Sequence, residues 1–124
     1  MNNKIIKEVK QLIKSLNLNC NIEEFKDKVD WYRISIYQNL SENFIKEFQD
    51  KVNWSYICEF QKLSENFIRE FKDKIDWYCI CEHQQFSEEF IREFQDKVNW
   101  DRINEFQKLS ESFIRKFQNK INWD

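Results

Sequence analysis

The chain lacks glycine and proline altogether, and it has a single histidine and a single methionine among its 124 residues. An average protein contains roughly 7% glycine and 5% proline. Sheet proteins use both residues at their tight turns, whereas both residues weaken the interior of a helix. Their absence therefore predicts an all-α protein in which Asn, Asp and Lys occupy the turns.

Long apolar stretches and an excess of charge of one sign are missing too. Charged residues make up 34% of the chain, yet the formal net charge is −2. That balance gives no general attraction to nucleic acid or to anionic lipid. No apolar run approaches the roughly 20 residues of a spanning helix, and no export signal is evident. We therefore expect a cytoplasmic protein without a membrane span, whose four cysteines are reduced thiols.

The chain consists of tandem copies of a 23-residue unit. Residues 40–62, 63–85 and 86–108 are full copies, 109–124 is a half copy, and 17–39 is a degenerate copy. The period is marked by two series of aromatic residues: Phe25, Phe48, Phe71, Phe94 and Phe117, and Trp31, Trp54, Trp77, Trp100 and Trp123. Such a period is typical of proteins built from stacked helical repeats.

Each copy contains two signals for the start of a helix. The residues expected to cap the first helix are Ser41, Ser64, Ser87 and Ser110, and those expected to cap the second are Asp30, Asn53, Asp76 and Asn99. Their side chains can accept hydrogen bonds from the free N–H groups of a first helical turn. Helices of about eight to ten residues are unstable alone, so each copy needs its neighbours. We therefore predict one domain, residues 1–124, forming a short α-solenoid of stacked helix-turn-helix repeats, with an amphipathic capping helix over residues 1–16.

The helical spacing also predicts which residues form the core. On the first helix, Phe44, Ile45, Phe48 and Val52 share one arc. On the second helix, the expected core arc contains Trp54, Ile57, Cys58 and Phe60.

One cluster could suggest a metal site, because Cys79, Cys81 and His83 form a C-x-C-x-H sequence. Aligning the copies favours a structural explanation. His83 occupies the position of Tyr37, Phe60 and Phe106, so we expect it to replace a core aromatic residue, and a zinc site normally needs four ligands. We predict no metal and no cofactor.

The last copy differs from the others. Asn122 and Trp123 begin a second helix that is not completed, so Phe113, Phe117 and Ile121 are expected to be half covered. A partner protein is expected to cover them, or a second copy of the chain, which would then self-associate through the half repeat. The alternative is that the array frays at this end.

Catalysis and direct nucleic-acid binding have little support. The lone histidine has no partner that the sequence identifies, a phosphate-binding glycine loop cannot exist, and the carboxylates recur in every copy. Some helical repeats read one RNA base each, but residues 40–62 hold four acids and three bases, close to neutral. We therefore predict that the protein is not an enzyme and has no catalytic residues. We expect contact with nucleic acid only through a bound ribonucleoprotein, and an RNA-binding repeat protein is the alternative.

Positions that change between copies lie mainly on the second helix, opposite its expected core arc. The candidate protein-binding residues at these positions are Tyr32, Arg33, Tyr56, Glu59, Tyr78, Glu82, Asp101 and Arg102. Tyr and Arg are enriched where protein interfaces have energetic hot spots. This variable stripe predicts a surface that binds another protein, and neutral drift on a solvated face is the alternative.

The sequences LSENFIREF (63–71) and DKIDW (73–77) resemble short tandem repeats in proteins of giant DNA viruses and of AT-rich bacteria and their phages. The resemblance covers 40–124 clearly and 17–39 loosely. Those repeats have no assigned activity, so the resemblance implies an architecture and a viral or phage setting in the host cytoplasm. In that setting, an inhibitor that binds a host defence nuclease, as anti-CRISPR proteins do, is a further alternative.

Overall fold

The computed structural model describes residues 1–121, and these residues form ten α-helices and no strand. The helices are α1 (Asn3–Ser15), α2 (Ile22–Lys28), α3 (Trp31–Tyr37), α4 (Glu42–Glu47), α5 (Trp54–Phe60), α6 (Glu65–Glu70), α7 (Trp77–His83), α8 (Glu88–Glu93), α9 (Trp100–Phe106) and α10 (Glu111–Lys116). The prediction of an all-α helical-repeat fold is confirmed. None of the described helices has the length and apolar composition that crossing a bilayer requires.

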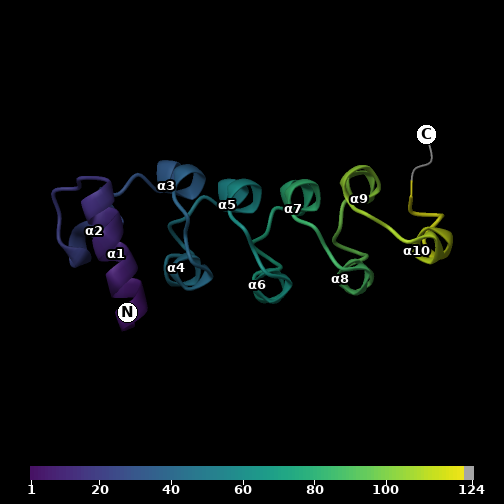
Figure 1. The fold of residues 1–124 in the computed structure, drawn as a ribbon, viewed down its shortest axis with the longest axis horizontal. Coiled ribbons are helices and arrows are strands. Elements are labelled where there is room, and N and C mark those ends of the chain that lie inside the picture. Colours follow the sequence, from purple (N-terminus) through teal and green to yellow (C-terminus); the bar gives the residue numbers. More distant parts are fainter. Residues whose placement is uncertain (122–124) are drawn as a thin grey trace. The chain divides into compact units, whose positions relative to one another are not determined.

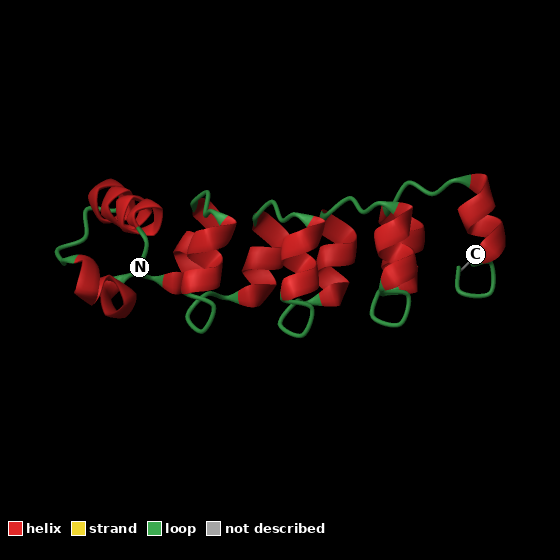
Figure 2. Ribbon diagram, turned by 90° about the horizontal axis from the view of Figure 1, so that it is seen from below, coloured by secondary structure: helices red, strands yellow, loops and turns green. Residues whose placement is uncertain are grey.

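The chain divides into two compact units, unit 1 (Met1–Ile57) and unit 2 (Cys58–Asp124), and the division falls inside α5. In unit 2, α6, α8 and α10 form one layer, and α7 and α9 form a second layer beside it (Figure 1). Seen from below, these short helices alternate with narrow loops (Figure 2). In unit 1, the predicted capping helix is α1, which contacts α2 and α4 and buries Ile5, Val9 and Leu12.

The predicted cap residues begin the helices. The Oγ atoms of Ser41, Ser64, Ser87 and Ser110 each accept the N–H of the Phe three residues later. At the second helices, the cap side chain likewise accepts the N–H of the residue three positions later, as seen for Asp30, Asp76 and Asn99. Asn53 accepts the N–H of Tyr56 in this way, at 3.0 Å. Helix starts are thus determined locally. At the end of α1, Asn17 takes the left-handed conformation (φ 53°), a role that glycine commonly fills.

The first helix of each full copy is shorter than predicted, six residues instead of eight to ten. In α6 the helix gives way to a turn at Phe71, whose carbonyl accepts from both Lys74 and Ile75. The Lys72 carbonyl would bond the N–H of Asp76 if the helix continued. It accepts the indole N–H of Trp77 instead, at 3.0 Å. The indoles of Trp31, Trp54 and Trp100 donate in the same way to the carbonyls of Lys26, Gln49 and Gln95. In the three full copies this bond closes the turn that follows the first helix.

Within each unit, tryptophans also join neighbouring copies. In unit 2 the Trp77 ring lies 6.2 Å from the ring of Phe90 and 5.2 Å from that of Phe94. In unit 1, Trp31 packs on Phe44 and Phe48 in the same way, at 6.1 and 5.1 Å. One side chain thus closes a turn within its copy and buries the aromatic core of the following copy.

The same packing overturns the prediction that the last copy is half covered. Phe113, Phe117 and Ile121 are only 0%, 7% and 5% exposed. Trp100, from the preceding copy, stacks on Phe113 at 6.4 Å and on Phe117 at 5.4 Å. The cover therefore comes from the copy before, whereas Asn122 and Trp123, on which the prediction relied, lie outside the described residues.

A second correction concerns the second helices. The position shared by Tyr37, Phe60, His83 and Phe106 was expected in the core, but Tyr37 is 76% exposed and Phe60 is 49% exposed. His83 is exposed as well, and Phe106 is half-buried. His83 therefore does not replace a core aromatic residue.

The residue that follows this position is buried instead, although it is a glutamine. Gln61, Gln84 and Gln107 are 5%, 9% and 7% exposed. The side-chain amide of Gln107 donates to the Cys81 and Gln84 carbonyls and accepts the N–H of Phe86 at 2.8 Å. Gln84 likewise donates to the Gln61 carbonyl at 2.7 Å. These amides bond backbone groups at the end of the second helix one copy earlier. Without the amides, those buried groups would have no hydrogen-bond partner.

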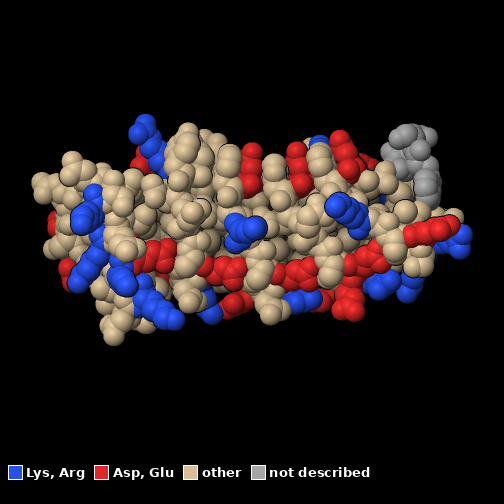
Figure 3. Space-filling view, in the orientation of Figure 1, with Lys and Arg blue, Asp and Glu red and all other residues tan. Residues whose placement is uncertain are grey.

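A third link joins the first helices of unit 2. The Glu65 carboxylate accepts the N–H and hydroxyl of Ser87, and Glu88 does the same for Ser110. Hydrogen bonds from the Ser110 backbone and hydroxyl lower the pKa of Glu88. In unit 1, Glu8 of the capping helix binds Ser41 in this way, so α1 takes the place of a first helix. Acidic side chains accordingly follow one another along the layer of α6, α8 and α10 (Figure 3).

Candidate functional site

The residues of the variable stripe lie on the outer side of the second helices, and none of them is buried. Tyr32, Arg33, Tyr78 and Asp101 are exposed, and Tyr56, Glu59, Glu82 and Arg102 are half-buried. This exposure follows from the helix period, because the buried Ile57, Ile80 and Ile103 lie on the opposite face. Their predicted role in protein binding stays a prediction.

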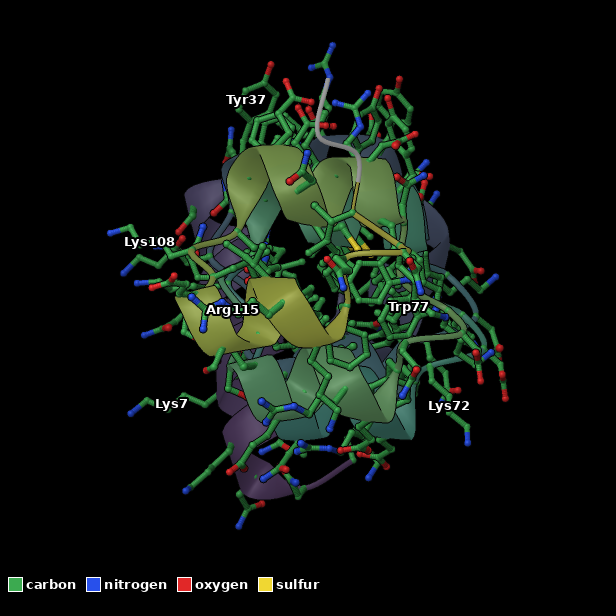
Figure 4. The ribbon with its side chains drawn as sticks, turned by 90° about the vertical axis from the view of Figure 1, so that its right-hand side faces the viewer. Lys7, Tyr37, Lys72, Trp77, Lys108 and Arg115 are labelled. Carbon is green, nitrogen blue, oxygen red and sulfur yellow. The ribbon has the colours of Figure 1, made fainter. Side chains whose placement is uncertain are left out.

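In unit 1 the stripe contributes a pair of tyrosines from neighbouring second helices. The Tyr32 and Tyr56 rings meet edge to face with centroids 4.6 Å apart, and their hydroxyl groups are hydrogen-bonded. Arg33 lies 3.6 Å from Asp30 at the exposed start of α3. Tyr37 points away from the helices into solvent (Figure 4). The face of unit 1 is therefore aromatic and close to neutral.

In unit 2 the stripe is organised around Arg102. Its guanidinium lies 4.2 Å from the centroid of the Tyr78 ring and 5.7 Å from that of Phe106. The same group is 3.9 Å from a Glu82 carboxylate oxygen and 3.6 Å from one of Glu105. Two helices, α7 and α9, therefore hold one cation between two aromatic rings and two carboxylates.

Three members of this cluster were not among the predicted residues: Glu105, Phe106 and His83. His83 Nε2 lies 4.0 Å from Glu82. Glu105 lies at one of the positions that change between copies, and Phe106 could have been found from the spacing, since it follows Arg102 by four residues on the same side of the helix. Phe106 was missed because its position had been assigned to the core.

The second-helix face of unit 2 is acidic. Its carboxylates are Glu59, Glu82, Asp101 and Glu105, and Arg102 is the cation among them. Acidic side chains are visible along the upper edge of the molecule over the end of α5, over α7 and over α9 (Figure 3). On the flanks of unit 2, by contrast, cationic side chains are present. Figure 4 shows Lys72 beside Trp77 on one flank, and Lys108 and Arg115 on the other.

The cysteines near this face are poor nucleophiles and poor metal ligands in their folded surroundings. Burial raises the pKa of Cys58 to about 12 and that of Cys81 to about 11, and burial together with Asp76 raises the pKa of Cys79 to about 11. Thiolates, which attack electrophiles and bind metals, are therefore scarce near neutral pH. Within residues 1–121, no three His, Cys, Asp or Glu side chains converge as a metal site would require.

The raised pKa values predict a loss of stability in alkali. The unfolded chain releases thiol protons near the ordinary pKa of 9.0, whereas folded Cys58 keeps its proton to about 12. Between these values the unfolded state binds fewer protons, so the free energy of unfolding falls by up to about 1.4 kcal/mol per pH unit for each buried thiol. Urea unfolding between pH 8 and 10.5 should show this slope. The Cys58→Ala, Cys81→Ala variant should have a shallower slope, and equal slopes would contradict the assignment.

Comparisons with known proteins return no relative of this chain. No protein-family model matches it, and neither the curated proteins nor the solved structures contain a significant match.

Proposed function

We propose that the protein is a non-catalytic scaffold that binds another protein through the outer face of its second helices. One observation supports this most directly. In the described part of the chain, the exposed large hydrophobic side chains other than Met1 are Tyr32, Tyr37, Phe60 and Tyr78, and all of them lie on second helices. Exposed apolar residues gathered on one kind of element, rather than scattered singly, are typical of interaction surfaces.

The face of unit 2 also favours binding because its central residues are held in place. Arg102 is fixed between Tyr78 and Phe106 and its side chain is 25% exposed. A side chain that is ordered before binding loses little conformational entropy when a partner arrives. Tyr and Arg are, in addition, residue types that often dominate interface energetics.

The charge of this face indicates the kind of partner. Glu59, Glu82, Asp101 and Glu105 surround the aromatic residues, so lysine or arginine side chains on a protein partner would complement the surface. The same carboxylates would repel a phosphate backbone, which makes direct RNA binding at this face the weaker proposal. In the viral or phage setting implied by the resemblance, this function would take the form of covering a host protein, such as a defence nuclease.

The test is a quantitative pull-down from lysate with the intact chain, a Tyr78→Ala, Arg102→Ala variant and a Lys72→Ala, Lys108→Ala control. A true partner is retained by the intact chain and the control, and is lost with the face variant. The purified partner should then bind the face variant at least 30-fold more weakly, as expected for loss of about 2 kcal/mol at a hot spot. Equal retention by both variants, or no partner for the intact chain, would contradict the proposal.

A further inference from the structure

A cavity of about 370 Å³ lies between α8 and α10 in unit 2. It is lined by Arg92, Gln95, Lys116, Phe117, Asn119 and Lys120. These side chains bring three cations and two amides, and no carboxylate is among the described residues that line the cavity. A concave site with several convergent cations is suited to an anion.

Each of the three cations lies over an aromatic ring. The Arg92 guanidinium lies 5.5 Å from the centroid of Phe113, Lys116 Nζ lies 5.9 Å from that of Phe117, and Lys120 Nζ lies 5.8 Å from that of Trp100. Phe117 and Phe113 belong to the buried core. Arg92 and Lys116 project from α8 and α10, and the other lining residues lie on the turns that follow these two helices.

Comparison with the preceding copy shows what has changed. There, Arg69 Nε donates to both carboxylate oxygens of Glu93, at 2.9 and 3.0 Å. One repeat later, Arg92 stands in the place of Arg69, and Lys116 stands in the place of Glu93. Asn119 likewise replaces the aspartate found at Asp27, Asp50, Asp73 and Asp96. Relative to the preceding copy, the two changes remove two carboxylates and add one lysine, so the net charge of this site is higher by three.

Because Lys116 replaces the glutamate, Arg92 lacks the carboxylate partner that Arg69 has. Its Nε is buried and has no hydrogen-bond partner among the described residues. A buried charged donor without an acceptor is costly, and a bound ion at the site is one physical explanation for such a group. Glu88 is close enough to Arg92 for its carboxyl pKa to be affected, but that carboxylate already accepts two hydrogen bonds from Ser110.

We infer that this cavity binds a small polyvalent oxyanion, a phosphate group or a polycarboxylate, whose oxygens take the place of the Glu93 carboxylate. The positive charges of the Arg92 guanidinium, Lys116 and Lys120 neutralise the anion, and the Gln95 and Asn119 amides can donate hydrogen bonds to it. Charge-assisted bonds of this type are the stronger ones in proteins. The site is separate from the second-helix face, so its test does not depend on the proposed scaffold function.

Isothermal titration calorimetry of the full chain with inorganic phosphate, with citrate and with chloride at matched ionic strength tests the inference. Saturable binding of phosphate or citrate, with none for chloride, is expected, and the stronger of the two ligands identifies the anion class. Lys116→Glu restores the acid of the other copies. It should weaken anion binding at least tenfold while raising the melting temperature of the anion-free protein, because Arg92 regains a partner.

Lys108→Glu is the matched control, since it makes the same charge change at an exposed position on the opposite flank from Trp77 (Figure 4). It should leave anion binding within twofold of the original. Lys120→Gln is a second cavity variant, expected to weaken binding without adding an acid. Equal weakening by Lys108→Glu and Lys116→Glu, or no saturable binding of phosphate and citrate, would overturn the inference.

Discussion

Replacing Trp77 by alanine is expected to lower the free energy of unfolding by about 3–5 kcal/mol, the range for removing a large aromatic side chain from a core. The indole contributes to two interfaces at once. It donates to the Lys72 carbonyl at 3.0 Å, which closes the turn after the first helix of its copy. It also packs on Phe90 and Phe94 of the next copy. Because short helices of this kind are stable only when stacked, loss of this ring weakens two neighbouring repeats together.

Tyr78→Ala is the matched control for that experiment. Tyr78 is the next residue on the same helix and is 48% exposed, so its loss should cost under about 1 kcal/mol, as for most surface substitutions. Urea unfolding followed by circular dichroism at 222 nm measures both variants. Similar midpoints for the two variants would contradict the assignment of the tryptophans as the residues that join the copies.

The second large effect is expected at Gln107. Its amide donates to the Cys81 and Gln84 carbonyls of the preceding copy and accepts the N–H of Phe86, the first residue of its own copy. Gln107→Leu keeps most of the side-chain volume but leaves these buried groups without partners, at about 1–3 kcal/mol for an unsatisfied group. We expect a total loss of about 2–4 kcal/mol in the free energy of unfolding.

Gln118→Ala is the control that separates the loss of buried hydrogen bonds from the loss of any glutamine side chain. Gln118→Ala changes an exposed glutamine of unit 2 and should shift stability by less than about 0.5 kcal/mol. If Gln107→Leu were as stable as the original protein, the buried glutamines would be packing residues whose amides contribute nothing. Amide hydrogen exchange at Phe86 offers an independent check, because its N–H should exchange faster once the Gln107 acceptor is removed.

The sequence alone was enough for the architecture, since the signals for it are local. The absence of glycine and proline excluded a strand-rich fold, and the 23-residue period located the repeats. Ser64 and Asp76 satisfy the N–H groups of their own helices, so cap residues can be recognised from neighbouring residues alone. The outward position of Tyr78 and Arg102 followed in the same way from the helix period.

Only the tertiary structure decided which polar residues enter the core and which aromatic residues leave it. Phe60 and Gln61 are adjacent, and hydrophobicity alone places Phe60 inside, whereas the structure buries the glutamine. The reason is that the end of each second helix leaves backbone groups that need an amide from the following repeat, a demand that arises only when repeats stack. The cluster around Arg102 and the cavity at Arg92 have the same origin. Each depends on residues about one period apart in the chain, which meet only because neighbouring copies pack together.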